Sequence, residues 1–375
     1  MAKIHYPKEE KPKRNKTWYK KQTEHGLSVW QILFRVVVAV SALALCISYL
    51  SIFIDPAFMS LPYFFGLYYI PLFLLNAALL VVGLLHMKKY LVVSLVALLP
   101  TLFFADLFIK FGGEEKSVAG DEVKLMTYNV GRFASAARGM NEAQAMSKIG
   151  EFAAREAPDI LCLQEFQTRD TSALERYIKY LPYRQYHFFG SSKSSYGNII
   201  LSRYPITDGG AITFKDSRNL CVWSDIRIGD HQVRVYNCHL QSNALSFTNI
   251  IKKMSQKGQF TDEVKTVHEN LAQRNLQRSG QVAMVHDHIA ACNIPSMICG
   301  DFNDTPMSYT YHRLAAGHKD SFADGGSGMG ATFSVLWPLL RIDYILVPEN
   351  VTCDRTTVNR VPFSDHYPVS TLIYF

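Results

Sequence analysis

Acid, amide and imidazole side chains recur over the last two thirds of the chain, and most of them follow a short apolar run. Carboxylate and amide oxygens suit a hard cation such as Mg²⁺, Mn²⁺ or Ca²⁺ better than Zn²⁺. Imidazoles exchange protons near neutral pH. If these side chains meet at one sheet edge, they predict a site for a divalent cation and a phosphate. The positions are Asn129, Glu165, His239, Asp301, Asn303, Asp343, Asp365 and His366.

The apolar runs predict the elements that hold these side chains. The spacing of apolar residues over 141–155 predicts a helix with Asn141 as its N-cap. Roughly a dozen short strands with few helices favour packed sheets with helices outside them. The clearest strand-like runs are 123–129, 159–165, 186–189, 198–202, 221–226, 232–239, 296–302, 343–347 and 369–375.

Three long apolar stretches precede these strands, at about 29–54, 61–85 and 90–108. Each reaches the roughly 20 residues that a membrane-spanning helix needs, and prolines are tolerated in such helices. A cleaved signal peptide is an alternative for the first stretch, and a buried soluble core is an alternative for all three. Three spans are favoured, because the first stretch is too long for a signal peptide and two more follow it.

The positive charge of the chain lies near its N-terminus. Residues 1–25 carry a net charge of +5 and residues 26–112 of +2, whereas residues 113–375 are neutral. Lys88 and Lys89 lie in the turn between the second and third stretches, and the turn at 55–60 has no Lys or Arg. Since Lys and Arg favour the cytoplasmic side, we expect the leader and the Lys88 turn in the cytoplasm. Residues 113–375 are then extracytoplasmic.

The sequence divides into four predicted parts: a basic leader (1–28), a three-helix membrane region (29–111), a polar linker (112–121) and a catalytic domain (122–375). The neutral charge of the last part weakens the case for nucleic acid, because nucleic-acid-binding domains usually carry a basic footprint. The seven cysteines form no CxxC pair and no cluster with histidine, so they do not indicate zinc.

Several segments of the fourth part, in this order, resemble the endonuclease/exonuclease/phosphatase superfamily. That superfamily includes deoxyribonuclease I, abasic-site endonucleases, inositol-phosphate 5-phosphatases and neutral sphingomyelinases. The resemblance covers about 122–375, and the combination of GDFN, SDH and an upstream LQE is specific. It implies a four-layer α/β sandwich in which two mixed sheets pack face to face between helices. The segments are TYNVGRF, PDILCLQEF, YGNIILSRYP, YNCHLQS, ICGDFND, RIDYILV and FSDHYPV.

The resemblance implies a metal site, with Mg²⁺ as the expected ion and Mn²⁺ or Ca²⁺ as alternatives. Glu165 would be the principal ligand, Asn129 would assist in binding metal or phosphate, and Asp365 would lie beside them. Some relatives place a second acid two positions after the first asparagine, where this chain has Gly131. We therefore expect one essential metal ion rather than two.

The resemblance also implies roles in hydrolysis. Asp301 would orient and deprotonate the attacking water, and Asn303 would donate to the phosphate or to the developing negative charge. His366 would contact a phosphate oxygen or protonate the leaving group, and Asp343 would fix its tautomer. His239 would be a second phosphate-contacting imidazole and a rival general acid.

The substrate is less determined by sequence. Apolar residues alternate with lysines in the stretch 241–281, which suits a surface of anionic lipid or an ordinary amphipathic helix on the sandwich. Arg274 and Arg278 share one helical face, either solvated or holding phosphate. The first hypothesis is a membrane-anchored hydrolase of a lipid head group or another phosphoester near the bilayer. The alternatives are an extracytoplasmic nuclease and a catalytically silent membrane scaffold.

Overall fold

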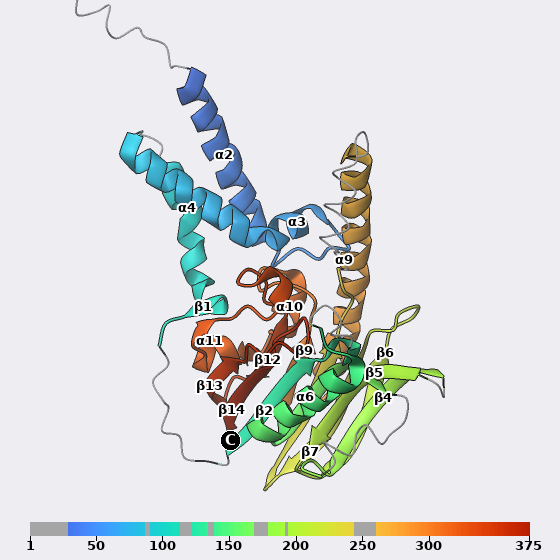
Figure 1. The fold of residues 1–375 in the computed structure, drawn as a ribbon. Helices are drawn as coiled ribbons and strands as arrows, with labels where there is room; N and C mark the ends of the chain where they lie inside the picture. Colours follow the sequence, from blue (N-terminus) through green and yellow to red (C-terminus); the bar gives the residue numbers. More distant parts are fainter. Residues whose placement is uncertain are drawn as a thin grey trace, which may run out of the picture.

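The computed structural model describes residues 29–86, 91–112, 120, 122–133, 139–168, 179–191, 194–243 and 260–375. A helical region, residues 29–111, lies above a two-sheet sandwich, residues 122–375 (Figure 1). The predicted leader, most of the predicted linker and residues 244–259 lie outside the described residues.

The first sheet of the sandwich has the strand order β13-β14-β2-β3-β5-β4. Only β2 and β3 run parallel, and every other neighbouring pair in this sheet is antiparallel. The bounds are β2 Glu122–Asn129, β3 Ile160–Thr168, β4 Tyr183–Ser191, β5 Ser194–Ser202, β13 Thr352–Val358 and β14 Val369–Tyr374.

The second sheet has the strand order β10-β12-β9-β8-β7-β6. It too contains a single parallel pair, β8 with β9. Both sheets are therefore mixed, as predicted. The bounds are β6 Ile206–Thr213, β7 Leu220–Ile228, β8 His231–His239, β9 Ser296–Asp301, β10 His318–Asp320 and β12 Asp343–Pro348.

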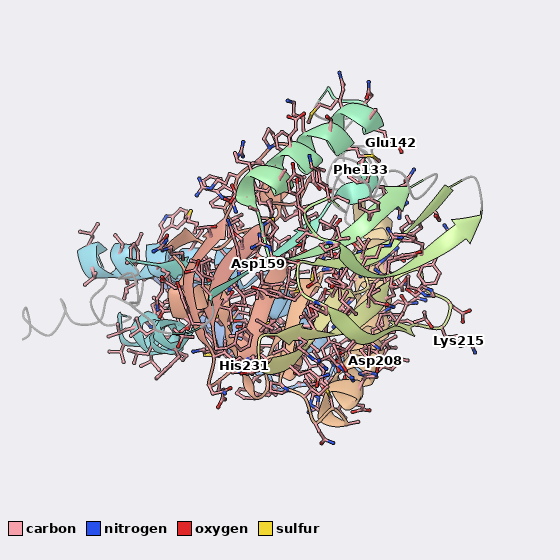
Figure 2. The ribbon with its side chains drawn as sticks, turned by 90° about the horizontal axis from the view of Figure 1, so that it is seen from below. Phe133, Glu142, Asp159, Asp208, Lys215 and His231 are labelled. Atoms are coloured by element: carbon pink, nitrogen blue, oxygen red, sulfur yellow. The ribbon has the colours of Figure 1, made fainter. Side chains whose placement is uncertain are left out.

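Helices cover the outer faces of the two sheets. α6 (Glu142–Glu156) packs on the first sheet through Ile149 and Phe152, and α9 (Phe260–Ala290) and α10 (Tyr309–Leu314) pack on the second. Figure 2 views the sandwich from below, with Glu142 marking α6 on one outer face. Asn141 caps α6 by accepting from the Gln144 amide, as predicted. The four-layer arrangement is thus confirmed.

Two longer strands were not predicted from the sequence. β6 and β13 lie at sheet edges, and their sequences, ITDGGAIT and TCDRTTV, lack a continuous apolar run. An edge strand needs less apolar surface because one of its sides has no neighbouring strand. Small additional elements are β1 Ile109–Lys110, β11 Gly328–Met329, α11 Ser321–Gly325, η4 Gly131–Phe133 and η7 Ser334–Leu336.

Three amide side chains form a polar seam inside the sandwich. Gln164 on β3 donates to Asn237 on β8 at 2.7 Å, and Asn237 donates to the Leu163 carbonyl at 3.0 Å. Asn198 on β5 donates to the Asn237 carbonyl at 3.1 Å. Buried hydrogen bonds of this kind hold one arrangement, since breaking them leaves polar groups unsatisfied. The seam therefore fixes how the two sheets align beneath their strand ends.

The helical region contains fewer membrane-length helices than predicted. α2 (Val29–Leu50) is the one helix in the described residues that is long and apolar enough to cross a membrane. Its length is about 33 Å. α3 (Leu61–Leu67) and α4 (Tyr69–His86) would form a second span only as a bent pair, with an angle of 70° between them. α5 (Leu91–Leu98) is short.

The expectation of three continuous spans is therefore wrong, and prolines explain the difference. Pro71 has no backbone N–H and its ring clashes with the carbonyl four residues earlier, at Leu67, where α3 ends. Pro100 lies where α5 gives way to the 3₁₀ helices η2 (Leu99–Phe103) and η3 (Ala105–Leu107). Both prolines thus mark a break.

Several contacts attach the helical region to the sandwich, and two of them involve Ser51 and Leu107. At the first, Ser51 donates to the Met307 carbonyl at 2.6 Å, and Gly66 lies so close to this carbonyl that a Cβ would overlap it. At the second, Arg341 donates to the Leu107 carbonyl at 2.9 Å, and β1 pairs with β11. The predicted domain boundary after residue 111 thus falls beyond a strand that already pairs with the sandwich.

Candidate active site

The topology explains why distant side chains meet. Asn129 ends β2, and His239 and Asp301 end the parallel strands β8 and β9 at paired positions. Asp343 begins β12, which runs antiparallel to β9, so that Asp343 pairs with Asp301. His366 precedes β14, which runs antiparallel to β2. Ends of parallel strands and beginnings of antiparallel ones share one sheet edge, and the predicted side chains gather there.

Asp301 is buried, and its carboxylate is held by three hydrogen bonds. Oδ1 accepts from the Asn303 backbone amide at 2.8 Å. Oδ2 accepts from the side chains of Asn129 at 2.9 Å and Asn303 at 3.0 Å. Burial raises the Asp301 pKa to about 7, and the charge of Asp343 adds to this, whereas His366 and the hydrogen bonds oppose it. The carboxylate is thus oriented and titrates near neutrality, as suits a general base.

His366 and Asp343 form a buried pair. His366 Nδ1 lies 3.0 Å from Asp343 Oδ2, and Nε2 lies 3.8 Å from Asp301 Oδ2. Burial lowers the His366 pKa, but the charges of Asp343 and Asp301 outweigh it and hold the pKa well above its usual value. The pair therefore keeps the imidazole protonated, with Nε2 directed at the space beside Asp301.

His239 has the opposite electrostatic environment. Its Nε2 lies 3.5 Å from Glu165 Oε1 and 4.0 Å from Asp301 Oδ2. Burial lowers its pKa, and the positive charges of His366 and Arg132 add to the effect against the attraction of Glu165. When two titratable groups are shifted apart, their roles separate. His366 is then the better proton donor, and neutral His239 suits a contact with phosphate.

Glu165 lies at an irregularity in β3. The register of β3 against β5 shifts between Leu163 and Phe166, and Glu165 has a φ of 50°. A non-glycine residue in this region is uncommon and often marks a functional site. Its carboxylate meets Arg132 Nε at 3.2 Å, and the guanidinium of Arg132 lies 4.3 Å from the Tyr196 ring centroid.

Sequence reasoning assigned no role to Arg132 or Tyr196. Arg132 directly follows the Asn129-Val130-Gly131 turn. This closeness to Asn129 in the sequence could have indicated that Arg132 lies near the site. Tyr196 gave none, because its approach depends on the pairing of β3 with β5.

The donor set fits a hard divalent cation. Ligand atoms of Asp301, Asp343 and His366 all lie within 4.8 Å of one another, although a protonated His366 offers no lone pair to a metal. Glu165 and Asp365 line the same cavity as Asp301 and add carboxylate oxygens. This is an oxygen-rich set. The oxygen of Asn129 accepts from the Gly131 amide at 3.0 Å while its amide holds Asp301. Here Asn129 holds the Asp301 carboxylate, and its predicted contact with metal stays a prediction.

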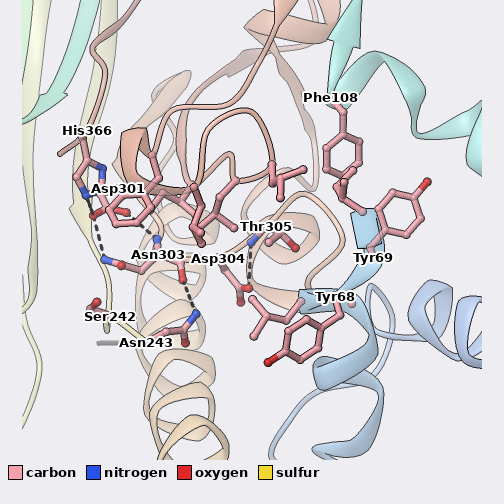
Figure 3. A pocket seen from close by; sticks show the side chains of 18 of the residues that line it. Tyr68, Tyr69, Phe108, Ser242, Asn243, Asp301, Asn303, Asp304, Thr305 and His366 are labelled. Carbon is pink, nitrogen blue, oxygen red and sulfur yellow. Dashed lines mark hydrogen bonds and ion pairs between the residues drawn. The ribbon is translucent and has the colours of Figure 1, made fainter. Parts of the chain in front are cut away.

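A cavity of about 530 Å³ adjoins this site. One wall carries Asp301, Asn303 and His366, and the facing wall carries aromatic residues of the helical region, such as Tyr68 and Phe108 (Figure 3). The apolar wall was not predicted, because nothing in the sequence shows that residues 66–71 fold against residues 301–305. The lining is Gly66, Leu67, Tyr68, Tyr69, Ile70, Pro71, Phe108, Glu165, Ser242, Asn243, Asp301, Asn303, Asp304, Thr305, Phe333, Leu336, Leu339, Leu340, Ile342, Asp365 and His366.

Neither arginine of α9 lines the cavity, and Arg278 is not solvated. Arg278 is buried, and its Nε lies 3.1 Å from Asp304 Oδ2. Arg274 donates to the Ser242 carbonyl at 3.1 Å. Both interpretations of Arg278, solvated or holding phosphate, are thus wrong, because its guanidinium is buried and forms an ion pair with Asp304. Most of the lysines and apolar residues predicted for a lipid surface in 241–281 lie outside the described residues.

Comparisons with protein families divide the chain as the structure does. The model of the "Endonuclease/Exonuclease/phosphatase family" matches residues 126–366, which lie within the sandwich. A model described as a domain of unknown function matches residues 31–107, which form most of the helical region.

The relatives and solved structures are distant. "Uncharacterized protein YbhP" of Escherichia coli strain K12 is 26% identical over 186 residues, or 48% of this chain and 63% of that protein. The chain thus spans less than two thirds of the length of this relative. An endonuclease/exonuclease/phosphatase from Beutenbergia cavernae is 17% identical with a TM-score of 0.52, covering 68% of this chain and 72% of that one.

A family protein from Bacteroides thetaiotaomicron is also 17% identical, with a TM-score of 0.50 over 68% of this chain and 99% of the other. At this level of identity, both structures show a shared fold alone.

Proposed function

Because the chain belongs to the endonuclease/exonuclease/phosphatase family, whose members are phosphoester hydrolases, we propose that it is a divalent-metal-dependent hydrolase acting in the described cavity. The observation that carries this proposal is the arrangement around Asp301. An oriented, buried carboxylate with a pKa near 7 lies 3.8 Å from a protonated imidazole. A water and a phosphoester between these groups would meet a base and an acid together.

The proposed reaction is direct hydrolysis. A bond forms between the water oxygen and phosphorus, and the bond from phosphorus to the ester oxygen breaks. Asp301 takes the proton of the water, and His366 gives a proton to the departing oxygen while Asp343 stabilises the imidazolium. A bound Mg²⁺ would neutralise the phosphate and stabilise the negative charge on the leaving oxygen. Glu165 and Asp365 are the ligands that we propose for it.

Asn303 has a second task in this scheme. Its amide nitrogen donates to the Leu240 carbonyl at 2.9 Å and to Asp301 at 3.0 Å, which occupies both amide hydrogens. In this arrangement Asn303 positions the base. Its predicted role as a donor to phosphate requires that one of these bonds be exchanged for the substrate.

We place the enzyme at a membrane, with the sandwich on the extracytoplasmic side. Of the 37 exposed large apolar side chains among the described residues, 28 belong to the helical region. Apolar exposure on this scale marks a surface that contacts lipid or protein. The start of α2 and the end of α4 both lie away from the sandwich (Figure 1).

A fusion tests the orientation. A reporter that is active only outside the cytoplasm, fused after residue 120, should be active. The same reporter fused before residue 29 should be inactive. An inactive fusion after residue 120 would overturn the proposed topology.

We propose a lipid head group, or another phosphoester near the bilayer, as the substrate. The cavity lining supports this choice over nucleic acid, because none of its described residues is Lys or Arg and nucleic-acid sites neutralise phosphates with those residues. An extracytoplasmic nuclease and a silent scaffold are the outcomes to be tested against it.

A substrate panel tests the activity. The purified full chain is assayed against phospholipid, sphingolipid and DNA, with Mg²⁺ and with a chelator. We expect lipid turnover that requires Mg²⁺ and falls by about 10³-fold or more in the Glu165→Gln, Asp301→Asn double variant. Asp208→Asn is the matched control, since Asp208 is exposed and does not line the cavity. Turnover of DNA alone would favour the nuclease, and full activity in the double variant would reject the site.

A further inference from the structure

The cavity beside Asp301 is built by both regions of the chain. Leu67, Tyr68 and Ile70 come from the junction of α3 and α4, and Phe108 comes from the end of the helical region. In Figure 3 these aromatic side chains lie across the cavity from Asp301 and His366. One side therefore carries the acidic and imidazole groups, and the described lining of the other side is mostly apolar and includes no Lys or Arg.

The helical side of the cavity is held in place by buried polar contacts. Tyr63 on α3 donates to Asn243 at 2.9 Å and accepts from the buried Arg278 at 3.0 Å. Arg278 in turn pairs with Asp304, three positions after Asp301. Loss of the contact between Arg278 and Asp304 would leave a buried charge without its partner. The apolar wall is thus a fixed part of the site.

The sandwich adds a second apolar surface through the loop 333–340. The Phe333 ring centroid lies 5.2 Å from that of His366, so the loop begins at the proposed acid. Leu336, Leu339 and Leu340 continue from it along the cavity, and Leu339 is 41% exposed. A chain leaving a phosphoester at His366 would meet this loop on one side and Tyr68 on the other.

We propose that this half of the cavity is a subsite for the apolar chain of an amphiphilic phosphoester, whose phosphate lies at Asp301 and His366. The assignment rests on the proposed hydrolysis. The whole cavity has a volume of about 530 Å³, which lies within the range of small-molecule sites. The helical region then contributes to substrate choice as well as to location. A polyanion would gain nothing from this wall.

A series of substrates with one reactive bond tests the subsite. The full chain in nanodiscs is assayed with Mg²⁺ on the methyl, butyl, octyl and dodecyl diesters of 4-nitrophenyl phosphate, each below its micelle concentration. Burial of each additional methylene should raise kcat/KM by up to about fourfold until the subsite is filled. The methyl diester reports the chemistry without the subsite.

Two substitutions in the same loop separate the subsite from partitioning into lipid. Leu339→Asp places a charge in the cavity and should lower kcat/KM for the dodecyl diester by about tenfold or more. The same variant should lower kcat/KM for the methyl diester by a clearly smaller factor, because the added charge repels every anionic diester but only the long chain also loses apolar contact. Val335→Asp is the matched control: Val335 is 61% exposed and does not line the cavity. This control should keep the full dependence on chain length.

The outcomes are distinguishable. Turnover of the methyl diester with no gain along the series would overturn the subsite and leave the proposed hydrolysis intact. An equal loss for both diesters in Leu339→Asp, or an equal loss in Val335→Asp, would also overturn it. If no diester is hydrolysed, the proposed function fails, and calorimetric binding of dodecylphosphonate against methylphosphonate decides the subsite. Tighter binding of dodecylphosphonate that Leu339→Asp abolishes supports it, and equal binding rejects it.

Discussion

The two regions of the molecule place their apolar side chains in opposite ways. The sandwich buries them between its sheets, where Val, Ile and Leu of both sheets form one core, and only nine of the 37 exposed large apolar side chains belong to it. The helical region turns most of its own outward. A region that buries its apolar residues is stable in water, whereas one that exposes them requires another apolar phase or a partner.

The difference also extends to polar groups. The sandwich brings the buried Asp301, Asp343 and His366 together at one sheet edge, while the described helical residues that line the shared cavity carry no charge. Under the proposed function the regions would be specialised, one for reaction and one for apolar contact. Substitutions in one region, or at the junction between the two, can test how far the regions depend on each other.

The largest effect is expected at the junction. Arg278→Met leaves Asp304 buried without its ion-pair partner, and loss of one partner of a buried pair costs about 3–5 kcal/mol. Hydrogen exchange should accelerate both in α9 and in α3, since Tyr63 loses the same partner. Gln277→Met on the exposed face of α9 is the control and should change neither. Faster exchange confined to α9 would show that the regions are independent.

A smaller effect is expected within the sandwich alone. His366→Gln should lower kcat by about 10²-fold or more, as for loss of a general acid. Asp343→Asn should lower it somewhat less, and the double variant should match His366→Gln because the two act as a unit. His231→Gln, on a strand end away from the site (Figure 2), is the control. Additive losses would separate Asp343 from His366.

The last expected effect is on stability as a function of pH. Asp301 has a folded pKa of about 7 against an ordinary 3.8, so the folded state binds more protons between these values. Stability of the metal-free protein should therefore fall as pH rises from about 4 to about 7. His366, whose pKa is raised, contributes stability that is present below its ordinary 6.5 and is lost as pH rises through its folded pKa.

Thermal unfolding in chelator checks this. The apparent Tm should decline over that interval in the natural sequence and decline less in Asp301→Asn. Added Mg²⁺ should offset the decline. Equal slopes in the two proteins would mean that Asp301 titrates near its ordinary value in the folded state.

Much of the sandwich was predictable because its signals are local. Asn141 and Gln144 cap a helix over a few residues, and apolar runs such as 232–239 form strands whatever their neighbours. The site was predictable for a related reason: polar residues that follow such runs must lie at strand ends. Asp301, at the end of β9, follows this pattern, whereas Glu165 lies within β3 and His366 precedes β14, and these two were named from the resemblance of their segments to the family.

The remainder depends on contacts that sequence spacing does not reveal. The Arg278 contact joins residues 215 positions apart, from Tyr63 to Arg278, and a helical face alone suggested solvent or phosphate. The cavity wall depends on the break before Pro71 and on the approach of Gly66 to the Met307 carbonyl. Composition identified the apolar stretches, but the bend that places one of them beside Asp301 is a tertiary feature.

The attachment of the helical region at both Met307 and Leu107 has a kinetic consequence. A domain on a loose tether explores a volume, whereas one held by several contacts keeps a fixed distance from its anchor. With α2 embedded in a bilayer, the opening beside Tyr68 would sample a plane. The protein and a lipid substrate would then meet by diffusion in two dimensions. The rate of encounter would depend on the mole fraction of substrate in the bilayer rather than on its concentration in solution.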